Sequence, residues 1–285
     1  MKTFTRILTD IQLDLLKKSL LKQEVKPSSP YIEYQWKTDG CTITAYNSKK
    51  VVFQGIDASF FAEQFPDETT SLIETHAGSD EVGTGDYFGP VCVCACFVDE
   101  TSSSKLKALQ VQDSKAMDDT TILKIGEQVM ALCPHSLLIL TNDKYNQIQP
   151  ENNMNKIKAK LHNQAYLHLS KKIQLPDMVI IDQFTPEKNY YSYLAQEPQV
   201  IDHIHFETKA ESKYLAVACA SVIARYAFLK QWEIMEKQFD FSFPKGAGDI
   251  VDQKAAIFVK KYGKEALKKV AKIHFKNTKK LSQYL

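Results

Sequence analysis

Hydrophobic positions in the first part of the chain follow two different spacings. Between Thr9 and Lys22, apolar residues recur every three or four positions, which predicts a helix with Thr9 or Asp10 as its N-cap. The segments that follow are separated by the turn sequences TDG and NSKK, which is typical of strands joined as hairpins. Three strands are predicted over 31–37, 41–46 and 51–55, and a short helix over 57–65. This part is therefore predicted to be a small α+β unit.

From about Glu74 onward, strand-like and helix-like patterns alternate over longer segments. The apolar run Val91–Val98 predicts a buried strand, and MVIID, which ends at Asp182, predicts another. The helix predicted over 211–239 begins with small residues, which suits close packing. The remaining predicted elements are helices over 119–132 and 153–173 and a strand over 135–141. Strands that alternate with helices imply an α/β core with a mixed sheet.

The change of pattern coincides with a polar, turn-rich segment that begins at Pro66. A chain of 285 residues exceeds one typical domain and allows a large core. We therefore predict an N-terminal unit over 1–66, a linker over 67–77 and a larger domain over 78–285.

The composition is that of an ordinary globular protein, with 44% hydrophobic and 25% charged residues. Of the six cysteines, Cys92, Cys94 and Cys96 fall on one face of a predicted strand. No Cys or His pair follows at zinc-finger spacing, so buried small hydrophobes are expected. The charged N-terminus predicts no signal peptide, and no apolar run reaches the length of a membrane span. Free cysteines fit a reducing cytoplasm.

The formal net charge of +2 hides an asymmetry along the chain. Residues 253–285 contain ten lysines and a single acid, Glu265, so this tail carries +9 and the remainder carries −7. Two interpretations remain open for the tail: a solvated helix face, or a surface that contacts phosphates.

Four acidic residues lie at the ends of predicted elements. Asp80 and Glu81 precede the apolar run, and two more follow or open an element further on, Asp182 and Glu211. A buried carboxylate must be paired, protonated or bound to a metal, and Mg²⁺ prefers oxygen ligands. Two such ions can clamp an in-line attack on a phosphodiester.

Ordinary structural roles remain open for each of these residues. Asp182 can cap a turn, and Glu211 can be favoured by a helix dipole. Adjacent side chains on a strand point opposite ways, so Asp80 and Glu81 need a local distortion to serve one site. Gly83 and Gly85 can supply it and allow close approach of backbone to a ligand, but they also fit an ordinary turn.

Several motifs together resemble the type 2 ribonucleases H, and ribonuclease HIII more than ribonuclease HII. The Gly-Thr-Gly at 83–85 and the ending KIHFKNT at 272–278 carry the resemblance to the HIII type, since the HII type usually has Gly-Arg-Gly. The other matching segments are QDSKAM (112–117), YN (145–146), NMNKIKAKLHNQA (153–165), IDQF (181–184), ETKAESKYLAVACASVIAR (207–225) and KGAG (245–248). The resemblance covers almost the whole chain, and residues 1–66 resemble the TBP-like extension of ribonuclease HIII.

This resemblance implies a ribonuclease H-like mixed sheet with flanking helices and an Asp-Glu-Asp-Glu site. Its catalytic, metal-binding members would be Asp80, Glu81, Asp182 and Glu211, with Mg²⁺ as the cofactor and Mn²⁺ as an alternative. Glu207 competes with Glu211 for the fourth position, and Asp80 is the best candidate to bridge two ions. The implied reaction is hydrolysis of the RNA strand of RNA/DNA hybrids, leaving 5′-phosphate and 3′-hydroxyl ends.

The resemblance also suggests substrate contacts. The backbone of Gly83, Thr84 and Gly85 would reach the ribose 2′-OH, the group that distinguishes RNA from DNA. Ser114 and Lys115 would lie in a neighbouring loop that meets a phosphate, although an ordinary surface loop stays open. In the N-terminal unit the candidates are Tyr34, Trp36, Lys49, Lys50 and Gln54, with core packing as the alternative for the two aromatics. His274 is expected to be structural or to contact substrate.

Three other functions compete with the hydrolysis of RNA/DNA hybrids. A ribonuclease HII-type enzyme would incise at single embedded ribonucleotides, but Thr84 and the N-terminal unit argue against it. A non-catalytic hybrid-binding protein would lack a carboxylate, and all four are present. A Rossmann-type enzyme would need a third glycine or a P-loop lysine motif. We expect a monomer with no membrane and no obligate protein partner.

Overall fold

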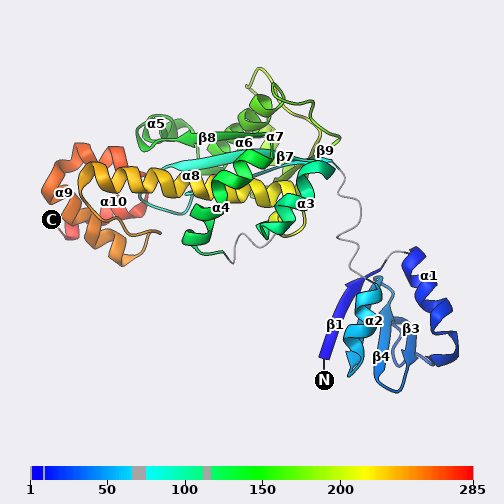
Figure 1. Ribbon diagram of the computed structural model, residues 1–285. Coiled ribbons are helices and arrows are strands. Elements are labelled where there is room, and N and C mark those ends of the chain that lie inside the picture. The colour runs from blue at the N-terminus through cyan, green and yellow to red at the C-terminus, as the bar shows by residue number, and fades with distance from the viewer. Residues whose placement is uncertain (1, 9, 66–74, 112–116, 285) are drawn as a thin grey trace. The chain divides into compact units, whose positions relative to one another are not determined.

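The computed structural model describes residues 2–8, 10–65, 75–111 and 117–284 of the chain (Figure 1). The chain separates into two compact units, 1–73 and 74–285. Most of the predicted linker, 67–77, lies outside the described residues. Its last three residues are described, and two of them, His76 and Ala77, belong to a strand because both are paired with the neighbouring strands.

The N-terminal unit is a five-stranded antiparallel sheet in the order β1-β5-β4-β3-β2. Its elements are β1 (Lys2–Ile7), α1 (Asp10–Ser19), β2 (Glu24–Val25), β3 (Ile32–Lys37), β4 (Cys41–Tyr46), β5 (Lys50–Gly55) and α2 (Ala58–Gln64). Leu16 of α1 and Ala62 of α2 share one core with Ile43 and Phe53, so the two helices cover one face of the sheet. The predicted small α+β unit is thus confirmed, with two additional strands.

The larger unit is built on a five-stranded sheet in the order β10-β9-β6-β7-β8. Its strands are β6 (His76–Val82), β7 (Val91–Val98), β8 (His135–Leu140), β9 (Met178–Asp182) and β10 (Ile204–Glu207). β6, β7 and β8 pair antiparallel, whereas β9 pairs parallel with β6 and β10 pairs parallel with β9. The predicted mixed sheet is confirmed.

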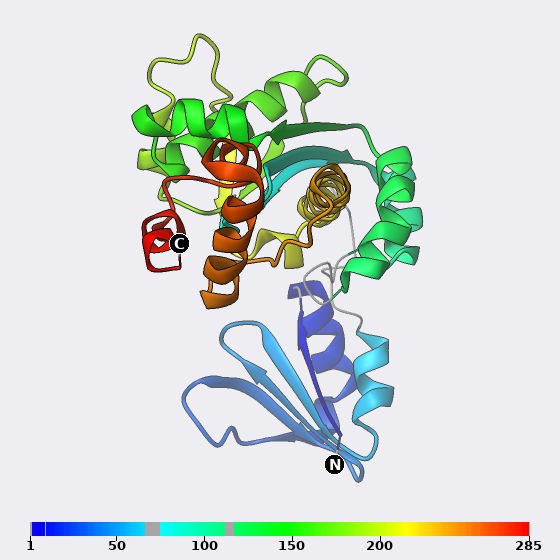
Figure 2. The same ribbon diagram turned by 90° about the vertical axis from the view of Figure 1, so that its left-hand side faces the viewer.

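Helices pack on both faces of this sheet. The helices of this unit are α3 (Glu100–Ala108), α4 (Asp119–Leu132), α5 (Asn142–Ile148), α6 (Met154–Leu169), α7 (Glu187–Tyr193), α8 (Leu215–Phe239), α9 (Asp249–Val270) and α10 (Lys276–Lys280). Figures 1 and 2 show α8 along one face, with α4 beside it, and α6 on the other. The small residues predicted for close packing meet here, since a Cβ on Gly78 would lie 2.4 Å from the Val217 nitrogen.

Side-chain alternation along β6 and β7 assigns each residue to a face. Ala77, Val91 and Val93 pack under α6 and α7 in one core cluster. Gly78 and the three cysteines of β7 lie on the α8 side, and all six cysteines are buried and free, as expected. Within the described part of the chain, no helix is long and apolar enough to cross a membrane.

Candidate active site

The parallel pairing of β6 and β9 brings two of the predicted acids together. Ser79 lies opposite Ile181 in the register, so the next position on each strand is Asp80 and Asp182. Residues in register on parallel strands face the same side of a sheet, and both acids therefore lie on the α8 side at the carboxyl edge. Ligands of open α/β sheets commonly bind outside this edge.

Asp80 is a buried carboxylate without a nearby cation among its described contacts. Its Oδ1 accepts a hydrogen bond from the Glu81 backbone N–H at 2.7 Å, and Ser221 of α8 also hydrogen-bonds to it. Burial raises the pKa of Asp80 to about 7, and the negative charges of Glu81 and Asp182 act in the same direction. Such a group is stabilised by any cation that reaches it.

Glu81 points to the opposite face of the sheet, toward α6. The Lys158 Nζ lies 2.6 Å from its Oε1, and the His162 Nε2 lies 2.9 Å from its Oε2. The other ring nitrogen of His162 is 2.7 Å from the Ser79 hydroxyl. Burial alone would raise the pKa of Glu81, but His162 and Lys158 outweigh it and lower the pKa to about 2. Glu81 is therefore held as a carboxylate.

The ring of Phe184 completes this arrangement around Glu81. The Lys158 ammonium lies 3.9 Å from its centroid, and the His162 ring stacks on it with centroids 5.3 Å apart. Phe184 follows β9 closely in sequence, in the segment IDQF. The cation–π contact and the stacking fix both α6 side chains in the orientation that reaches Glu81.

Asp182 organises the turn that carries the fourth acid. Its Oδ1 accepts a hydrogen bond from the Ala210 N–H at 2.9 Å. Lys209 adopts a left-handed conformation with φ 55°, and a short 3-10 turn over Ala210–Ser212 follows. Glu211 is buried in this turn with 5% of its surface exposed, just before α8.

Glu207 has a different environment from Glu211. It pairs with Asp182 across β9 and β10, but its carboxylate contacts the Lys213 Nζ at 2.5 Å and the His205 Nε2 at 3.5 Å. The hydrogen bond from Lys213 lowers the pKa of Glu207. Burial and the Asp182-anchored turn favour Glu211 as the fourth acid, and that choice stays a prediction.

The two glycines after β6 are not equivalent. Gly83 has φ +88°, and a Cβ there would lie 2.2 Å from the Pro90 carbonyl oxygen and 2.9 Å from the Phe228 ring. Gly85 has no atom within 4 Å of an added Cβ. Gly83 is therefore required by the turn itself, whereas Gly85 borders open space that a ligand can enter.

The structure adds functional candidates that the sequence reasoning missed. Lys158 and His162 are four residues apart in a predicted helix, so they share a face, and this spacing was the only available signal. No sequence pattern indicated Ser79 or Ser221, because their roles depend on packing between α6, β6 and α8.

The structure describes only some of the predicted substrate contacts of the larger unit. Ser114 and Lys115 fall outside the described residues. Beyond them, Arg225 of α8 holds the chain before α4 by donating to the Met117 carbonyl at 2.8 Å and to Asp119 at 2.7 Å. His274 packs against Tyr145, with ring centroids 5.5 Å apart, which fits the structural role.

Trp36 does not serve as a substrate contact in this structure. Its side chain is fully buried in the N-terminal core, on the sheet face that α1 and α2 cover. Tyr34 stacks on it with centroids 5.7 Å apart and is half-buried beneath Lys17, whose ammonium lies 3.8 Å from the ring. Both aromatics therefore pack, whereas Lys50 and Gln54 point to the other face of the sheet.

The four predicted acids offer only carboxylate oxygens, which would suit a hard divalent cation. As the described side chains stand, no group of three or more His, Cys, Asp and Glu is already arranged around one metal position. Glu81 instead contacts Lys158 and His162 on the face of the sheet that α6 covers. The raised pKa of buried Asp80 nevertheless fits a site whose charge a cation neutralises.

Comparison with known proteins extends these observations to the whole chain. The family model for Ribonuclease HII matches residues 77–278, and a Domain of unknown function (DUF3378) matches residues 6–76. Ribonuclease HIII of Listeria monocytogenes serotype 4b is 40% identical, with 94% of each chain covered. Ribonuclease HIII of Bacillus mycoides is 42% identical, again with 94% of each chain covered.

The crystal structure of Bst-RNase HIII in complex with Mn²⁺ has the same architecture. It superimposes with a TM-score of 0.76 at 36% identity, covering 99% of this chain and 98% of that chain. These similarities run through both units. The chain belongs to the ribonuclease HIII family.

Proposed function

We propose that this protein is a divalent-metal-dependent endonuclease that hydrolyses the RNA strand of RNA/DNA hybrids, leaving 5′-phosphate and 3′-hydroxyl ends. The observation that carries the proposal is the buried Asp80 beside Asp182 at the carboxyl edge, in a chain that resembles ribonuclease HIII over 94% of its length. Cleavage of phosphodiesters at carboxylate sites is the chemistry that two divalent ions support.

Asp80, Glu81, Asp182 and Glu211 are the residues that would hold the metal. When bound, the cation neutralises the carboxylates and activates water for attack on the phosphodiester. We propose Mg²⁺ as the physiological ion, and Mn²⁺ as a substitute because the Bst-RNase HIII structure contains it. Lys158 and His162 keep Glu81 ionised, and Ser221 orients the Asp80 carboxylate.

Recognition of RNA is assigned to the loop after β6. The open space beside Gly85 lets the backbone of Gly83, Thr84 and Gly85 approach a ribose 2′-OH. Ser114 and Lys115 remain proposed phosphate contacts. Because one chain supplies all four acids, we propose that the protein acts as a monomer. The six free cysteines support a cytoplasmic location.

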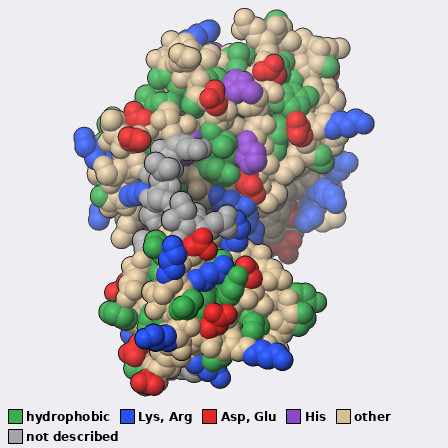
Figure 3. All heavy atoms as spheres, turned by 90° about the vertical axis from the view of Figure 1, so that its right-hand side faces the viewer, with side chains coloured by type: hydrophobic (Ala, Val, Ile, Leu, Met, Phe, Trp, Pro, Cys, Tyr) green, Lys and Arg blue, Asp and Glu red, His purple; other side chains and the backbone are tan. Residues whose placement is uncertain are grey.

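The N-terminal unit is proposed to bind the hybrid through the sheet face that α1 and α2 leave uncovered. Gln54 lies on this face in register with Thr42, and Lys49 and Lys50 lie at the start of β5. Residues 1–66 carry only nine basic and seven acidic residues. Figure 3 accordingly shows basic and acidic side chains interspersed on the face it draws. Binding must then depend on local contacts, not on bulk charge.

A cleavage assay with end-group analysis tests the proposed reaction. The enzyme with Mg²⁺ should cut the RNA strand of a uniform hybrid internally and leave 5′-phosphates, and excess chelator should stop it. The Asp80→Asn variant should bind the hybrid and cut it more slowly by orders of magnitude. Binding without any metal-dependent cleavage would instead favour the rival function of a non-catalytic hybrid-binding protein.

A further inference from the structure

Lys272 is a fully buried lysine whose amino group donates hydrogen bonds to backbone carbonyls. The Nζ donates to the Asp86 carbonyl at 2.8 Å and to the Gly89 carbonyl at 2.6 Å. Its backbone N–H donates to the Tyr87 carbonyl at 2.8 Å, and Phe88 bridges to Ala271. The side chain therefore closes the turn over 86–89 from within.

Burying an ammonium group costs free energy, so favourable contacts must offset that cost. Burial lowers the pKa of Lys272 to about 7, although the charge of Asp86 opposes the shift. The Tyr145 ring lies 6.0 Å from the Nζ and adds a weak cation–π contact. The main gain is that a single side chain satisfies two carbonyls of a tight turn.

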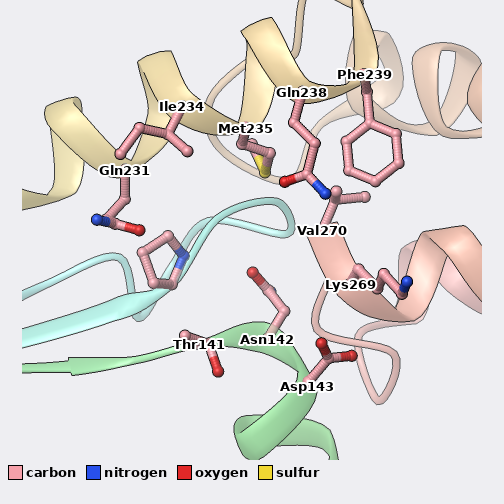
Figure 4. A pocket seen from close by; sticks show the side chains of 11 residues that line it. Thr141, Asn142, Asp143, Gln231, Ile234, Met235, Gln238, Phe239, Lys269 and Val270 are labelled. Carbon is pink, nitrogen blue, oxygen red and sulfur yellow. The ribbon is translucent and has the colours of Figure 1, made fainter.

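The Gly89 carbonyl accepts a second hydrogen bond from the other side of the turn. Asn142, at the start of α5, donates its Nδ2 to the same Gly89 carbonyl at 2.9 Å. Figure 4 shows Asn142 on one wall of a pocket between β7, α8 and the end of α9. Gly89 itself has φ +76°, and a Cβ there would lie 2.9 Å from the Trp232 ring. The turn is therefore fixed from three directions.

The rest of the segment 272–278 ties the same turn to the KGAG loop over 245–248. The Tyr87 hydroxyl lies 2.9 Å from the Thr278 hydroxyl, and the Gly246 N–H donates to Asp86 Oδ1 at 2.6 Å. Asn277 donates to the Ala247 carbonyl at 2.9 Å. Two loops that are far apart in sequence are thus held by one C-terminal segment.

The turn over 86–89 is the direct continuation of Gly83–Gly85. Gly83 lies where an added Cβ would be 2.2 Å from the Pro90 oxygen, whereas Gly85 borders open space, so the position of Gly85 depends on where residue 86 is held. We infer that Lys272 is a positioning residue that sets the preference of the Gly83–Gly85 backbone for ribose over deoxyribose. This inference rests on the proposed function, and it gives the segment KIHFKNT a role in substrate selection.

Removing the ammonium should shift the turn and leave the carboxylates unaffected. In Lys272→Met the side chain still fills the same space, but the Asp86 carbonyl loses the hydrogen bond from the ammonium. Gly85 should then sample positions from which its backbone misses the 2′-OH. The expected result is a loss of selectivity for RNA that exceeds any loss of phosphate binding.

The experiment measures binding, so that cleavage does not interfere. Affinities for an RNA/DNA hybrid and for a DNA duplex of the same sequence are compared in the full-length Asp80→Asn protein, with and without Lys272→Met. We expect the ratio of the two affinities to fall by roughly tenfold, as for the loss of one well-placed polar contact. Lys276→Met is the matched control, because it removes an equal charge from an exposed position in the same segment.

The outcomes separate the inference from the function on which it rests. If the Asp80→Asn protein binds both duplexes equally, the proposed hybrid recognition itself is wrong. If it prefers the hybrid and the folded Lys272→Met protein keeps the same preference, the inference about Lys272 is overturned. A ratio that falls equally in Lys276→Met would overturn it too, since charge alone would then explain the effect.

A milder substitution decides the matter if Lys272→Met does not fold. Thr278→Val removes the hydroxyl that contacts Tyr87 at a partly exposed position. It should lower the same affinity ratio in the same direction by a smaller factor, about two- to threefold. An unchanged ratio in Thr278→Val would contradict the role of this segment in ribose selection.

Discussion

The Lys158 ammonium lies 2.6 Å from Glu81 Oε1, and both side chains are about nine-tenths buried. The two residues belong to α6 and β6, and His162 binds the second carboxylate oxygen from one turn further along α6. Glu81 therefore has cationic or hydrogen-bonding partners on both oxygens before any metal arrives. Asp80, the preceding residue, is buried on the opposite face of the sheet, and burial raises its pKa.

Lys158→Met should destabilise the metal-free protein, because it leaves a buried carboxylate without its ammonium. The expected loss of unfolding free energy at pH 7 is on the order of 3 kcal/mol. Lys160→Met is the matched control on the same helix. Its partly exposed pair with Glu197, at 2.9 Å, should contribute less than about 1 kcal/mol. Chemical denaturation measures both, and equal losses would contradict the account of Glu81.

Asp80→Asn should stabilise the metal-free protein at high pH. The folded pKa of Asp80 is raised from 3.8 to about 7, so its contribution is fully present below pH 3.8 and is lost as the pH rises through 7. The Asn variant does not titrate, and its advantage in Tm should grow between pH 5 and pH 8. Glu81 does not interfere, since its lowered pKa keeps its contribution constant above about pH 4.5.

Metal binding supplies the control for this prediction. Mg²⁺ should raise the Tm of the wild-type protein at pH 8, since ligands that bind the folded state stabilise it. The same addition should change the Tm of Asp80→Asn much less. A Tm advantage of the Asn variant that is equally large at pH 5 and pH 8 would show that ionisation of Asp80 is not its cause.

Glu211→Gln should lower metal-dependent cleavage by orders of magnitude, whereas Glu207→Gln should keep activity within about threefold. The reason is that Glu211 is buried beside the turn anchored on Asp182, while Glu207 is half-exposed and paired with Lys213. Steady-state cleavage of a uniform hybrid compares the two variants. If Glu207→Gln is the inactive one, the fourth acid has been misassigned.

Gly83→Ala should mainly lower stability, whereas Gly85→Ala should mainly lower hybrid cleavage. Alanine at position 83 meets the Pro90 oxygen at φ +88° and should cost at least about 2 kcal/mol of stability. Alanine at position 85 meets no atom and should change stability by less than about 0.5 kcal/mol. It should nevertheless weaken hybrid cleavage by about tenfold, because the methyl group occupies the space assigned to the ribose. Normal turnover of Gly85→Ala would place the substrate elsewhere.

Most of the fold could be predicted from local patterns because the central strands are buried on both faces. The run Val91–Val98 and the strand ending at Asp182 are apolar for this reason. Four strands were not predicted, and three of them, β1, β2 and β10, lie at the edges of their sheets. The fourth, β6, is central, but its sequence HAGSDEV is mostly small or charged and so lacks an apolar run. An edge strand has one neighbour and is half-exposed, so its apolar pattern is weak.

The site could be predicted only in part for a similar reason. Acids at element ends are visible in a single sequence, and the register of β6 and β9 aligns Asp80 with Asp182. The partners of Glu81 come from positions 77 and 81 residues away, and they depend on how α6 packs across the sheet. That Tyr34 and Trp36 share a face was predictable, but not that α1 and α2 cover that face.

The most direct measurement of the central claim is cleavage of three duplexes of one sequence under identical conditions with Mg²⁺. One carries a complete RNA strand, one carries a single ribonucleotide in DNA, and one is DNA only. We predict efficient cutting of the uniform hybrid, poor cutting at the single ribonucleotide and no cutting of DNA, which lacks the 2′-OH. Efficient incision at the single ribonucleotide would indicate the ribonuclease HII type of activity. Cleavage of the DNA duplex, or failure to cut the uniform hybrid, would contradict the account.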